Sequence, residues 1–410
     1  MSTAVCRSCG TALRHTFADL GMSPLANSYV KPGQLNQKEA FFPLHVRVCA
    51  SCFLVQLEVA IMPEDLFSEY AYFSSYSDSW LDHAKSYVDS IVQRFGLNQD
   101  SRVIEIASND GYLLQYFIQK KIPVLGIEPA KNVAEDAVKK SIPTLVRFFG
   151  EETARDLAQE GKQADLLIAN NVLAHVPDLR GFIVGLKTLL AKRGIITLEF
   201  PHLLRLIAEN QFDTIYHEHL SYFSIITIEK LFSRYGLTVF DVEELPTHGG
   251  SLRIYACHED DHSKCISSRV SNLVTKEETA GLDSLEGYLS FSKRIQRTKC
   301  KLLHFLIQAK KEGKSVAAYG APAKGNTLLN YCGIRTDFID YTVDRSPHKQ
   351  DHFLPGTHIP IHHPDKIKET QPDYLLILPW NLKDEIMEHM SHIRDWDGRF
   401  IIPIPEVTVL

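Results

Sequence analysis

The sequence predicts an α/β protein in three parts: a small β-rich lobe over residues 1–70, a Rossmann-like domain over 71–250 and a second Rossmann-like α/β domain over 251–410. Two observations support this division. Two cysteine pairs lie within the first 52 residues, and the order strand, loop, helix begins twice, near residues 101 and 315. A chain of 410 residues also exceeds the size of one ordinary hydrophobic core, so several domains are expected.

The composition is that of a globular protein, with 44% hydrophobic residues, 23% charged residues and a net charge of -6. Non-specific nucleic-acid binding needs a basic surface, so the acidic balance argues against it. No apolar run approaches the roughly 18 residues of a membrane helix. The N-terminus lacks the basic and apolar regions of a secretory signal. We therefore expect a cytoplasmic protein without a nucleic-acid or membrane partner.

The N-terminal lobe carries two C-x-x-C motifs, formed by Cys6 with Cys9 and by Cys49 with Cys52. Four thiolates can close a tetrahedral zinc site and leave no position for water or substrate, so we expect structural zinc. The 39 residues between the pairs are more than in many zinc ribbons, and a redox motif or two chance pairs are the alternatives. Strands are expected over 41–49 and 54–57, after a turn-rich stretch over 20–28.

The central domain opens with a strand from residue 101, a small polar loop that ends at Gly111, and a helix over 112–118. A dinucleotide fold would carry G-x-G-x-x-G in this loop, whereas this loop has one glycine. A ligand with ribose and adenine but no phosphate fits better, which favours S-adenosylmethionine over another nucleotide. Glu128 ends the next strand, over 124–127, and could bind the ribose hydroxyls. The remaining cofactor candidates lie at strand ends and in the loops that follow them: Glu105, Asn109, Asp110, Gly111, Asn170 and Asn171.

Residues 216–219 read Tyr-His-Glu-His, and all four side chains can move protons or stabilise charge. A histidine titrates near neutrality and can accept a proton from carbon, while a tyrosine can hydrogen-bond an enolate oxygen. A polar loop with a chance histidine pair is the alternative. His175 follows the strand over 165–171 and is either a helix-start histidine or part of the same site.

The C-terminal domain repeats the order strand, glycine loop, helix over 315–330, after a long helical linker over 274–312. Backbone amides at such a helix start, together with a lysine, suit a phosphate or diphosphate, although this is not a Walker loop. A structural α/β domain with solvated charges is the alternative. The candidates for substrate contact are Arg253, Gly320, Lys324, Gly325, Asn326, Asp344, Arg345, Lys349 and Trp380.

Taken jointly and in order, these motifs resemble the sugar C-methyltransferases of deoxysugar pathways. The resemblance runs nearly end to end and rests on the paired C-x-x-C motifs and on blocks 105–111, 174–178, 216–219, 247–253 and 319–325. It implies a zinc lobe, a class I methyltransferase domain that binds S-adenosylmethionine, and a C-terminal domain that holds a nucleotide sugar. It also implies methylation at C-3 of a dTDP-4-keto-6-deoxy sugar.

On this resemblance, His219 would remove the C-3 proton and Glu218 would orient the histidine or the sugar. Tyr216 and His175 would hydrogen-bond the enolate oxygen or shuttle protons. The resemblance supports a tyrosine of segment 69–80 at the sugar without fixing which one. The further candidates are Tyr70 in catalysis and Tyr72, Tyr76 and His217 in substrate binding.

Two other functions stay open from the sequence. One is an O- or N-methyltransferase that acts on a small metabolite, and the other is a non-catalytic zinc-containing adaptor. Methylation of a hydroxyl needs no carbon acid, so the His-Glu-His block argues against the first. The sequence leaves open which nucleotide and sugar are used, whether C-3 carries a hydroxyl or an amine, and the stereochemical outcome. It also leaves the oligomeric state open, although the resemblance favours a monomer.

Overall fold

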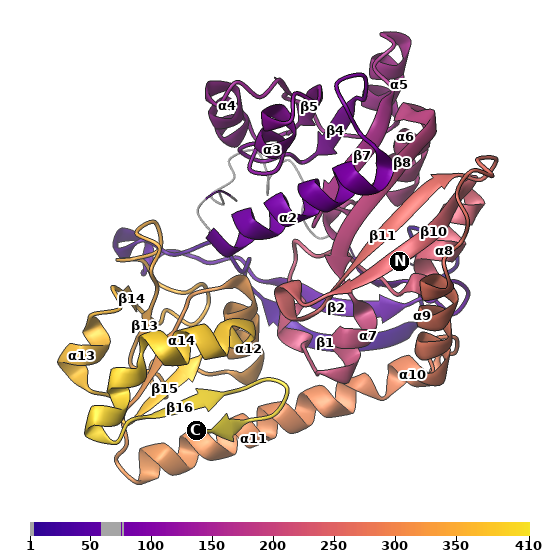
Figure 1. Cartoon of the computed structure of the whole chain (residues 1–410). Helices are drawn as coiled ribbons and strands as arrows, with labels where there is room; N and C mark the ends of the chain where they lie inside the picture. The colour runs from indigo at the N-terminus through magenta and orange to yellow at the C-terminus, as the bar shows by residue number, and fades with distance from the viewer. Residues whose placement is uncertain (1–3, 59–74, 76–77) are drawn as a thin grey trace.

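The computed structural model describes residues 4–58, 75 and 78–410 of the chain. Three sheets organise these residues, in the strand orders β1-β2-β3-β9, β10-β11-β8-β7-β4-β5-β6 and β14-β13-β12-β15-β16-β17 (Figure 1). The predicted α/β class, with a β-rich lobe followed by two Rossmann-like sheets, is confirmed. Tyr70, Tyr72 and Tyr76 lie outside the described residues.

The N-terminal sheet is antiparallel and is completed by a strand from far along the chain. Its members are β1 (His15–Ser23), β2 (Phe42–Val48), β3 (Val55–Leu57) and β9 (Ser221–Tyr222). The turn-rich stretch expected over 20–28 therefore begins inside a strand, because β1 pairs with β2 as far as Ser23. Since β9 begins two residues after His219, pairing of β3 with β9 fixes one end of the Tyr-His-Glu-His block.

The parallel strands of the central sheet lie beneath the predicted cofactor loop. Its strands are β4 (Val103–Ile106), β5 (Val124–Ile127), β6 (Thr144–Leu145), β7 (Ala164–Asn170), β8 (Leu190–Pro201), β10 (Leu237–Leu245) and β11 (Ser251–His258). All residues of β4 are buried, as expected for a strand covered by helices on both faces. Because β11 pairs with β8 and β10, the central sheet extends to His258, beyond the predicted boundary at residue 250.

Helices cover this sheet and connect its strands. They are α2 (Asp78–Phe95), α3 (Leu114–Gln119), α4 (Lys131–Lys139), α5 (Glu151–Gln159), α6 (Leu179–Leu189), α7 (Leu203–Ala208) and α8 (Ile225–Arg234). Short 3-10 helices lie in the connecting segments: η1 (Pro32–Gln34), η3 (Leu173–His175), η4 (Phe212–Thr214), η5 (Thr247–Gly249), η6 (Trp380–Leu382) and η7 (Ser391–Trp396).

The linker expected over 274–312 is helical and is divided into several helices. They are α9 (Ser268–Thr279), α10 (Glu286–Leu289) and α11 (Phe291–Lys311). The chain turns at Gly281, whose φ is +82°, and Gly287 packs so closely that a Cβ there would lie 2.2 Å from the Gly281 carbonyl oxygen. From this turn, α11 runs beneath the N-terminal sheet to the C-terminal domain (Figure 1).

The C-terminal sheet is parallel apart from its last strand. Its strands are β12 (Val316–Tyr319), β13 (Thr342–Val343), β14 (Ile361–His362), β15 (Tyr374–Ile377), β16 (Arg399–Ile402) and β17 (Thr408–Val409), and its helices are α12 (Ala323–Cys332), α13 (Lys366–Thr370) and α14 (Lys383–His389). One buried hydrophobic cluster joins this domain to the N-terminal sheet and includes Phe17, Phe291 and Trp380. The rings of Phe17 and Phe291 stack with centroids 4.8 Å apart.

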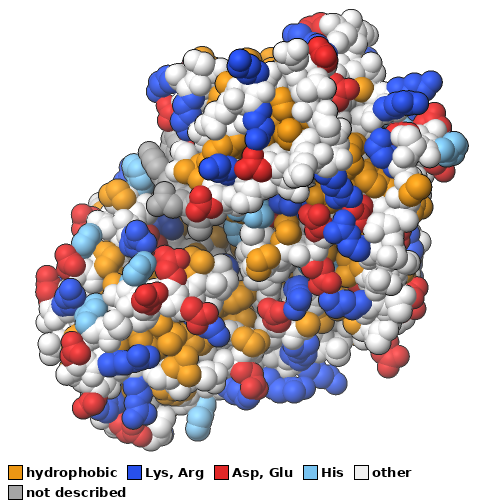
Figure 2. All heavy atoms as spheres, viewed as in Figure 1, with side chains coloured by type: hydrophobic (Ala, Val, Ile, Leu, Met, Phe, Trp, Pro, Cys, Tyr) orange, Lys and Arg blue, Asp and Glu red, His pale blue; other side chains and the backbone are white. Residues whose placement is uncertain are grey.

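The surface mixes charges of both signs. Figure 2 shows lysines and arginines interspersed with aspartates and glutamates over the visible face. In the described part of the chain, no helix is long and apolar enough to cross a membrane.

Candidate active site

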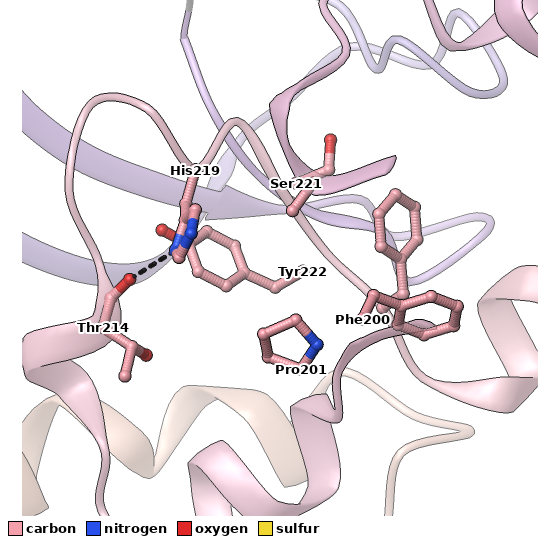
Figure 3. A pocket seen from close by; sticks show the side chains of 8 residues that line it. Phe200, Pro201, Thr214, His219, Ser221 and Tyr222 are labelled. Carbon is pink, nitrogen blue, oxygen red and sulfur yellow. Dashed lines mark hydrogen bonds between the residues drawn. The ribbon is translucent and has the colours of Figure 1, made fainter. Parts of the chain in front are cut away.

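His219 is held in one neutral tautomer by two hydrogen bonds. Its Nδ1 lies 2.8 Å from the carbonyl oxygen of Thr214, and because a carbonyl only accepts, Nδ1 carries the proton (Figure 3). The lone pair of Nε2 then accepts the hydroxyl of Tyr216 at 2.8 Å. Burial, followed by the nearby His175, lowers the pKa of His219 well below its usual value. The imidazole is therefore unprotonated at neutral pH and able to act as a base.

His175 and Glu218 lie beside this pair, as the sequence predicts. Nδ1 of His175 donates to the backbone carbonyl of Glu218 at 2.7 Å, and the His175 and His219 rings lie 4.9 Å apart. Burial lowers the pKa of His175 to about 4 and raises the pKa of Glu218. The carboxylate of Glu218 accepts a hydrogen bond from Asn27 at 2.6 Å. The structure thus brings together all four residues predicted for proton chemistry in the described region.

His217 lies apart from this group. Its side chain is buried, and its ring packs edge-on against Phe42 of the N-terminal lobe, with centroids 5.9 Å apart. Both of its ring nitrogens are buried without a hydrogen-bond partner in the described structure, so the predicted substrate contact stays a prediction.

A small cavity adjoins the His219 ring and is also lined by Thr214, Ser221 and Tyr222 (Figure 3). Its volume of about 10 Å³ holds about one water molecule, so it cannot admit a sugar. A substrate must therefore approach His219 from another side.

The predicted cofactor residues gather at the carboxyl edge of β4, β5 and β7. Four buried oxygens there have no hydrogen-bond partner within the described structure: Glu105 Oε2, Ser108 Oγ, Asp110 Oδ1 and Asn170 Oδ1. Burial, followed by the charges of Glu128 and Asp110, raises the pKa of Glu105 well above its usual value. Unpaired buried oxygens are costly, so this edge suits a ligand that brings amino and hydroxyl donors.

Glu128 also braces the cofactor loop. Its two carboxylate oxygens accept the backbone amides of Asn109 at 2.9 Å and Ala130 at 2.8 Å. A carboxylate has about four acceptor positions, so capacity remains for ribose hydroxyls. Gly111, with a φ of +76°, is required here, because a Cβ would lie 2.1 Å from Cδ1 of Ile142. Asn109 and Asn171 also adopt positive φ, of 51° and 56°.

The four cysteines of the N-terminal lobe converge as predicted. Their sulfur atoms all lie within 4.8 Å of one another, with 3.5 Å between Cys6 and Cys52 and 3.4 Å between Cys9 and Cys49. A tetrahedral zinc ion with four bonds of about 2.3 Å requires sulfur separations of about 3.8 Å, so the cluster fits zinc. The amide of Gln56 donates to the sulfur of Cys6 at 3.1 Å.

Arg7, inside the first C-x-x-C motif, links this cluster to the His219 loop. Its guanidinium donates to the carbonyl of Leu220, to Ser221 Oγ at 3.2 Å and to the carbonyl of Leu57 at 2.5 Å. The zinc lobe is distant from His219 in sequence, yet its Arg7 binds the carbonyl of Leu220, which directly follows His219.

Arg253, a predicted substrate contact, also braces Glu199, while its Nε is buried without a hydrogen-bond partner in the described structure. It is buried, and its guanidinium lies 2.8 Å from the Glu199 carboxylate. His83 at 3.0 Å and the Thr247 hydroxyl at 2.9 Å also contact Glu199. Burial alone would raise the pKa of Glu199, but the His83 hydrogen bond and the charge of Arg253 bring it below the usual value.

Lys324 and Trp380 of the C-terminal domain face the segment that carries His219. Trp380 donates its indole N–H to the buried Asp213 at 2.7 Å. Lys324 lies over the Trp380 ring, 4.6 Å from its centroid, and donates to Asn381 at 2.7 Å. Burial raises the pKa of Asp213 to about 6, whereas it lowers the pKa of Lys324.

The glycine loop after β12 is braced by protein groups. Asp344 accepts the amide of Ala321 at 2.8 Å, and Lys349 donates to the Ala321 carbonyl at 3.0 Å. Tyr29, from the N-terminal lobe, donates to the same carbonyl at 2.6 Å. Because the Ala321 amide is already used, a phosphate at this loop would depend on Lys324 and Lys349 more than the sequence suggests.

The other residues predicted to contact the substrate in this domain are Gly320, Gly325, Asn326 and Arg345. A Cβ on Gly320 would lie 2.6 Å from Pro379, and one on Gly325 would lie 2.8 Å from Leu378. Asn326 is buried, and its side-chain oxygen accepts from Asn330 at 3.2 Å. Arg345 is largely exposed and lies 3.6 Å from Glu385, away from the buried group.

Three family models match consecutive parts of the chain. They describe a zinc binding domain over residues 6–67, a methyltransferase domain over 80–242 and a C-methyltransferase C-terminal domain over 246–405. The C-methyltransferase NovU of Streptomyces niveus is 36% identical over 406 residues, which cover 99% of this chain and 96% of that protein. The chain belongs to the C-methyltransferase family.

Solved structures resemble this C-methyltransferase only in part. Magnesium protoporphyrin IX methyltransferase from Synechocystis PCC 6803 with bound SAM is 17% identical, with a TM-score of 0.33, over 43% of this chain and 79% of that chain. A SAM-dependent methyltransferase from Anabaena variabilis is 19% identical, with a TM-score of 0.35, over 42% of this chain and 83% of that chain.

Family membership decides between the functions left open by the sequence. The C-methyltransferase is an S-adenosylmethionine-dependent enzyme with a zinc-binding lobe, as the motifs predict. A non-catalytic adaptor and an O- or N-methyltransferase are both disfavoured, because the match to a C-methyltransferase runs along nearly the whole chain.

Sequence reasoning missed several residues of this C-methyltransferase that the structure places at the site. They are Asn27, Tyr29, His83, Glu199, Asp213 and His248. Asn27 and Tyr29 fall in a stretch taken only as turn-rich. His248 had a usable signal, since it stands between Thr247 and two glycines in one of the family's blocks.

Proposed function

We propose that this C-methyltransferase transfers a methyl group to C-3 of a nucleotide-linked 4-keto-6-deoxy sugar, of the dTDP type, with His219 as the base. The observation that carries the proposal is the neutral His219, whose Nδ1 proton is fixed by Thr214 and whose Nε2 lone pair faces Tyr216. A proton on carbon beside a ketone is acidic enough for such a base once the enolate is stabilised.

Tyr216 would form different hydrogen bonds before and after the sugar binds. Without a ligand its hydroxyl donates to Nε2 of His219, which occupies the lone pair that the C-3 proton needs. Rotation of this hydroxyl onto the C-4 oxygen would free Nε2 and supply the enolate with a hydrogen-bond donor. One such donor typically contributes about 10²- to 10³-fold to turnover.

Glu218 and His175 would assist proton removal by His219. The Glu218 carboxylate, held by Asn27, would orient the sugar, and its raised pKa allows it to carry a proton more readily than an exposed glutamate. His175 is neutral and would hydrogen-bond the enolate oxygen or pass a proton onward. Tyr70, Tyr72 and Tyr76 remain proposed sugar contacts.

S-adenosylmethionine, when bound, supplies an electrophilic methyl group to the carbon nucleophile. Glu105, Asp110 and Asn170 would hold its amino-acid end, since each has a buried oxygen without a partner in the described structure, and Glu128 would bind its ribose through its remaining acceptor positions. For the nucleotide sugar, we propose that Lys324 and Lys349 bind the diphosphate, because both are lysines beside the start of α12.

The test is to incubate the protein with S-adenosylmethionine and dTDP-4-keto-6-deoxyglucose and to follow the sugar by mass spectrometry and proton NMR. A product heavier by one methylene that has lost its C-3 proton supports the proposal. Deuterium uptake at C-3 from heavy water, without methyl donor, would show separately that the protein removes this proton. An unchanged sugar, from protein whose melting temperature rises with S-adenosylmethionine, rejects this acceptor.

A further inference from the structure

The turn over residues 247–250 has an unusual backbone. His248 adopts a φ of +55°, and the next two residues, Gly249 and Gly250, adopt +90° and +117°. Left-handed φ is uncommon for a residue with a side chain, and asparagine, aspartate and histidine adopt it more often than the others. The backbone of this turn therefore accepts His248, and its surroundings indicate what the side chain does.

The surrounding structure keeps this turn in place. The Gly249 carbonyl accepts from Gln211 at 2.7 Å, and the Gly250 carbonyl accepts from the backbone amide of His202 at 3.0 Å. A Cβ on Gly249 would lie 2.8 Å from Trp380. The turn is thus fixed against both the segment before His219 and the C-terminal domain.

The His248 side chain is exposed, so packing does not explain it. Its ring lies 5.2 Å from that of Trp80, and its Nε2 lies 3.4 Å from the side-chain nitrogen of Asn171. Because that amide nitrogen only donates, Nε2 is the acceptor and the neutral ring carries its proton on Nδ1. Within the described structure, no protein acceptor is bonded to this Nδ1.

His248 lies between the three parts of the proposed site. Asn171 directly follows β7 at the cofactor edge. On the other side, His248 is near enough to His219 to help lower the pKa of His219. On the third side, His248 lies close enough to Lys324 of the C-terminal domain for that charge to act on its ring.

We propose that His248 is a further substrate-binding residue, whose Nδ1–H donates a hydrogen bond to an oxygen of the acceptor sugar. The bond would hold the acceptor between His219 and the cofactor edge, with Asn171 fixing the tautomer of the ring. This inference rests on the proposed function, because it takes the acceptor to be a sugar that carries hydroxyl and carbonyl oxygens. The fixed turn explains why such a donor would be well oriented before the substrate arrives.

The experiment compares the wild type with His248→Asn, His248→Gly and a control, His304→Asn, which alters an exposed histidine on α11. Asparagine and glycine both tolerate left-handed φ, so neither substitution should disturb the turn. Turnover is measured with S-adenosylmethionine and dTDP-4-keto-6-deoxyglucose, and cofactor binding by the shift in melting temperature with S-adenosylmethionine.

We expect kcat/KM for the sugar to fall at least about tenfold in both His248 variants. Both His248 variants should keep the wild-type melting shift with S-adenosylmethionine. The control variant should keep both the wild-type kcat/KM and the wild-type melting shift. Values of kcat/KM within about twofold of the wild type overturn the role of His248. The role is also overturned if the His248 variants lose the melting shift with S-adenosylmethionine as fully as they lose kcat/KM, since that result would assign His248 to cofactor binding. An inactive wild type rejects the proposed function itself, and the inference with it.

Discussion

Trp380 and Asp213 are joined by a hydrogen bond of 2.7 Å between residues 167 positions apart, and this bond connects the C-terminal domain to the His219 loop. Asp213 is followed by Thr214, whose carbonyl oxygen accepts the Nδ1 proton of His219. Movement of the C-terminal domain would therefore displace the Thr214 carbonyl, which sets the tautomer of His219. The second oxygen of Asp213 is buried without a hydrogen-bond partner in the described structure.

The first prediction concerns the pH dependence of stability that Asp213 creates. Burial raises its pKa from 3.8 to about 6, so the folded state binds this proton more tightly than the unfolded state. The stability due to this group is complete below pH 3.8 and is lost as the pH rises through about 6. A shift of about two units corresponds to an order of 3 kcal/mol. In Asp213→Asn this loss should vanish, while the amide oxygen can still accept from Trp380.

Urea unfolding between pH 4 and pH 7 checks this prediction. The free energy of unfolding of Asp213→Asn, relative to wild type, should increase with pH over that window. Asp100→Asn, which alters an exposed aspartate, is the matched control and should show no such trend. A difference that stays constant or decreases with pH would contradict the assignment.

The second prediction is that Arg7 couples the zinc lobe to the His219 loop. Arg7→Ala removes one donor from the carbonyl of Leu57 and one from the carbonyl of Leu220, which keeps the Leu57 amide, and this should cost about 1–3 kcal/mol of stability. Turnover should fall as well, because Leu220 directly follows His219. Zinc content should stay at one ion per chain, since the arginine is not a ligand. Arg14→Ala, at an exposed arginine of the same lobe, is the control. Loss of zinc from Arg7→Ala would show that Arg7 acts on the metal site instead.

The sequence sufficed for the elements whose neighbours are local. The strands β4, β5 and β12 could be predicted because strands covered on both faces are short apolar runs followed by a loop and a helix. The zinc cluster could be predicted because two motifs of fixed spacing carry its ligands.

Elements that depend on distant partners could not be predicted. β9 is two residues long and exists because it pairs with β3, which no local pattern reveals. Arg7 contacts Leu220 across 213 positions. The pairing of Arg253 with Glu199 could not be predicted for the same reason, since Glu199 lies on a neighbouring strand that is distant in sequence.

The third prediction concerns the base. His219→Asn removes the Nε2 lone pair and should lower turnover by at least about 10²-fold, while binding of S-adenosylmethionine and of dTDP persists. The control is His217→Asn, at the neighbouring histidine that packs against Phe42, which should lose stability more than turnover per folded molecule. Deuterium uptake at C-3 from heavy water separates deprotonation from methyl transfer. Uptake by His219→Asn at the wild-type rate would remove His219 from this role.

The fourth prediction is the pH profile of kcat/KM. Because burial and His175 lower the pKa of His219, it remains unprotonated at pH values where an exposed histidine takes up a proton. The acid limb should therefore lie below the usual histidine pKa of 6.5, and the profile should be flat from that value to neutrality. An acid limb centred above 6.5 would contradict the assignment.

The fifth prediction separates packing from phosphate binding at Gly325. A Cβ at this helical position would lie 2.8 Å from Cβ of Leu378, so Gly325→Ala should cost about 1–3 kcal/mol through overpacking. The higher helix propensity of alanine would offset up to about 1 kcal/mol of this loss of stability. The affinity for dTDP, measured by calorimetry on the folded variant, should stay near that of the wild type. Gly33→Ala is the control, because nothing lies within 4 Å of the added Cβ and its φ is not positive. Weaker dTDP binding at unchanged stability would restore the phosphate-contact role that the sequence suggests.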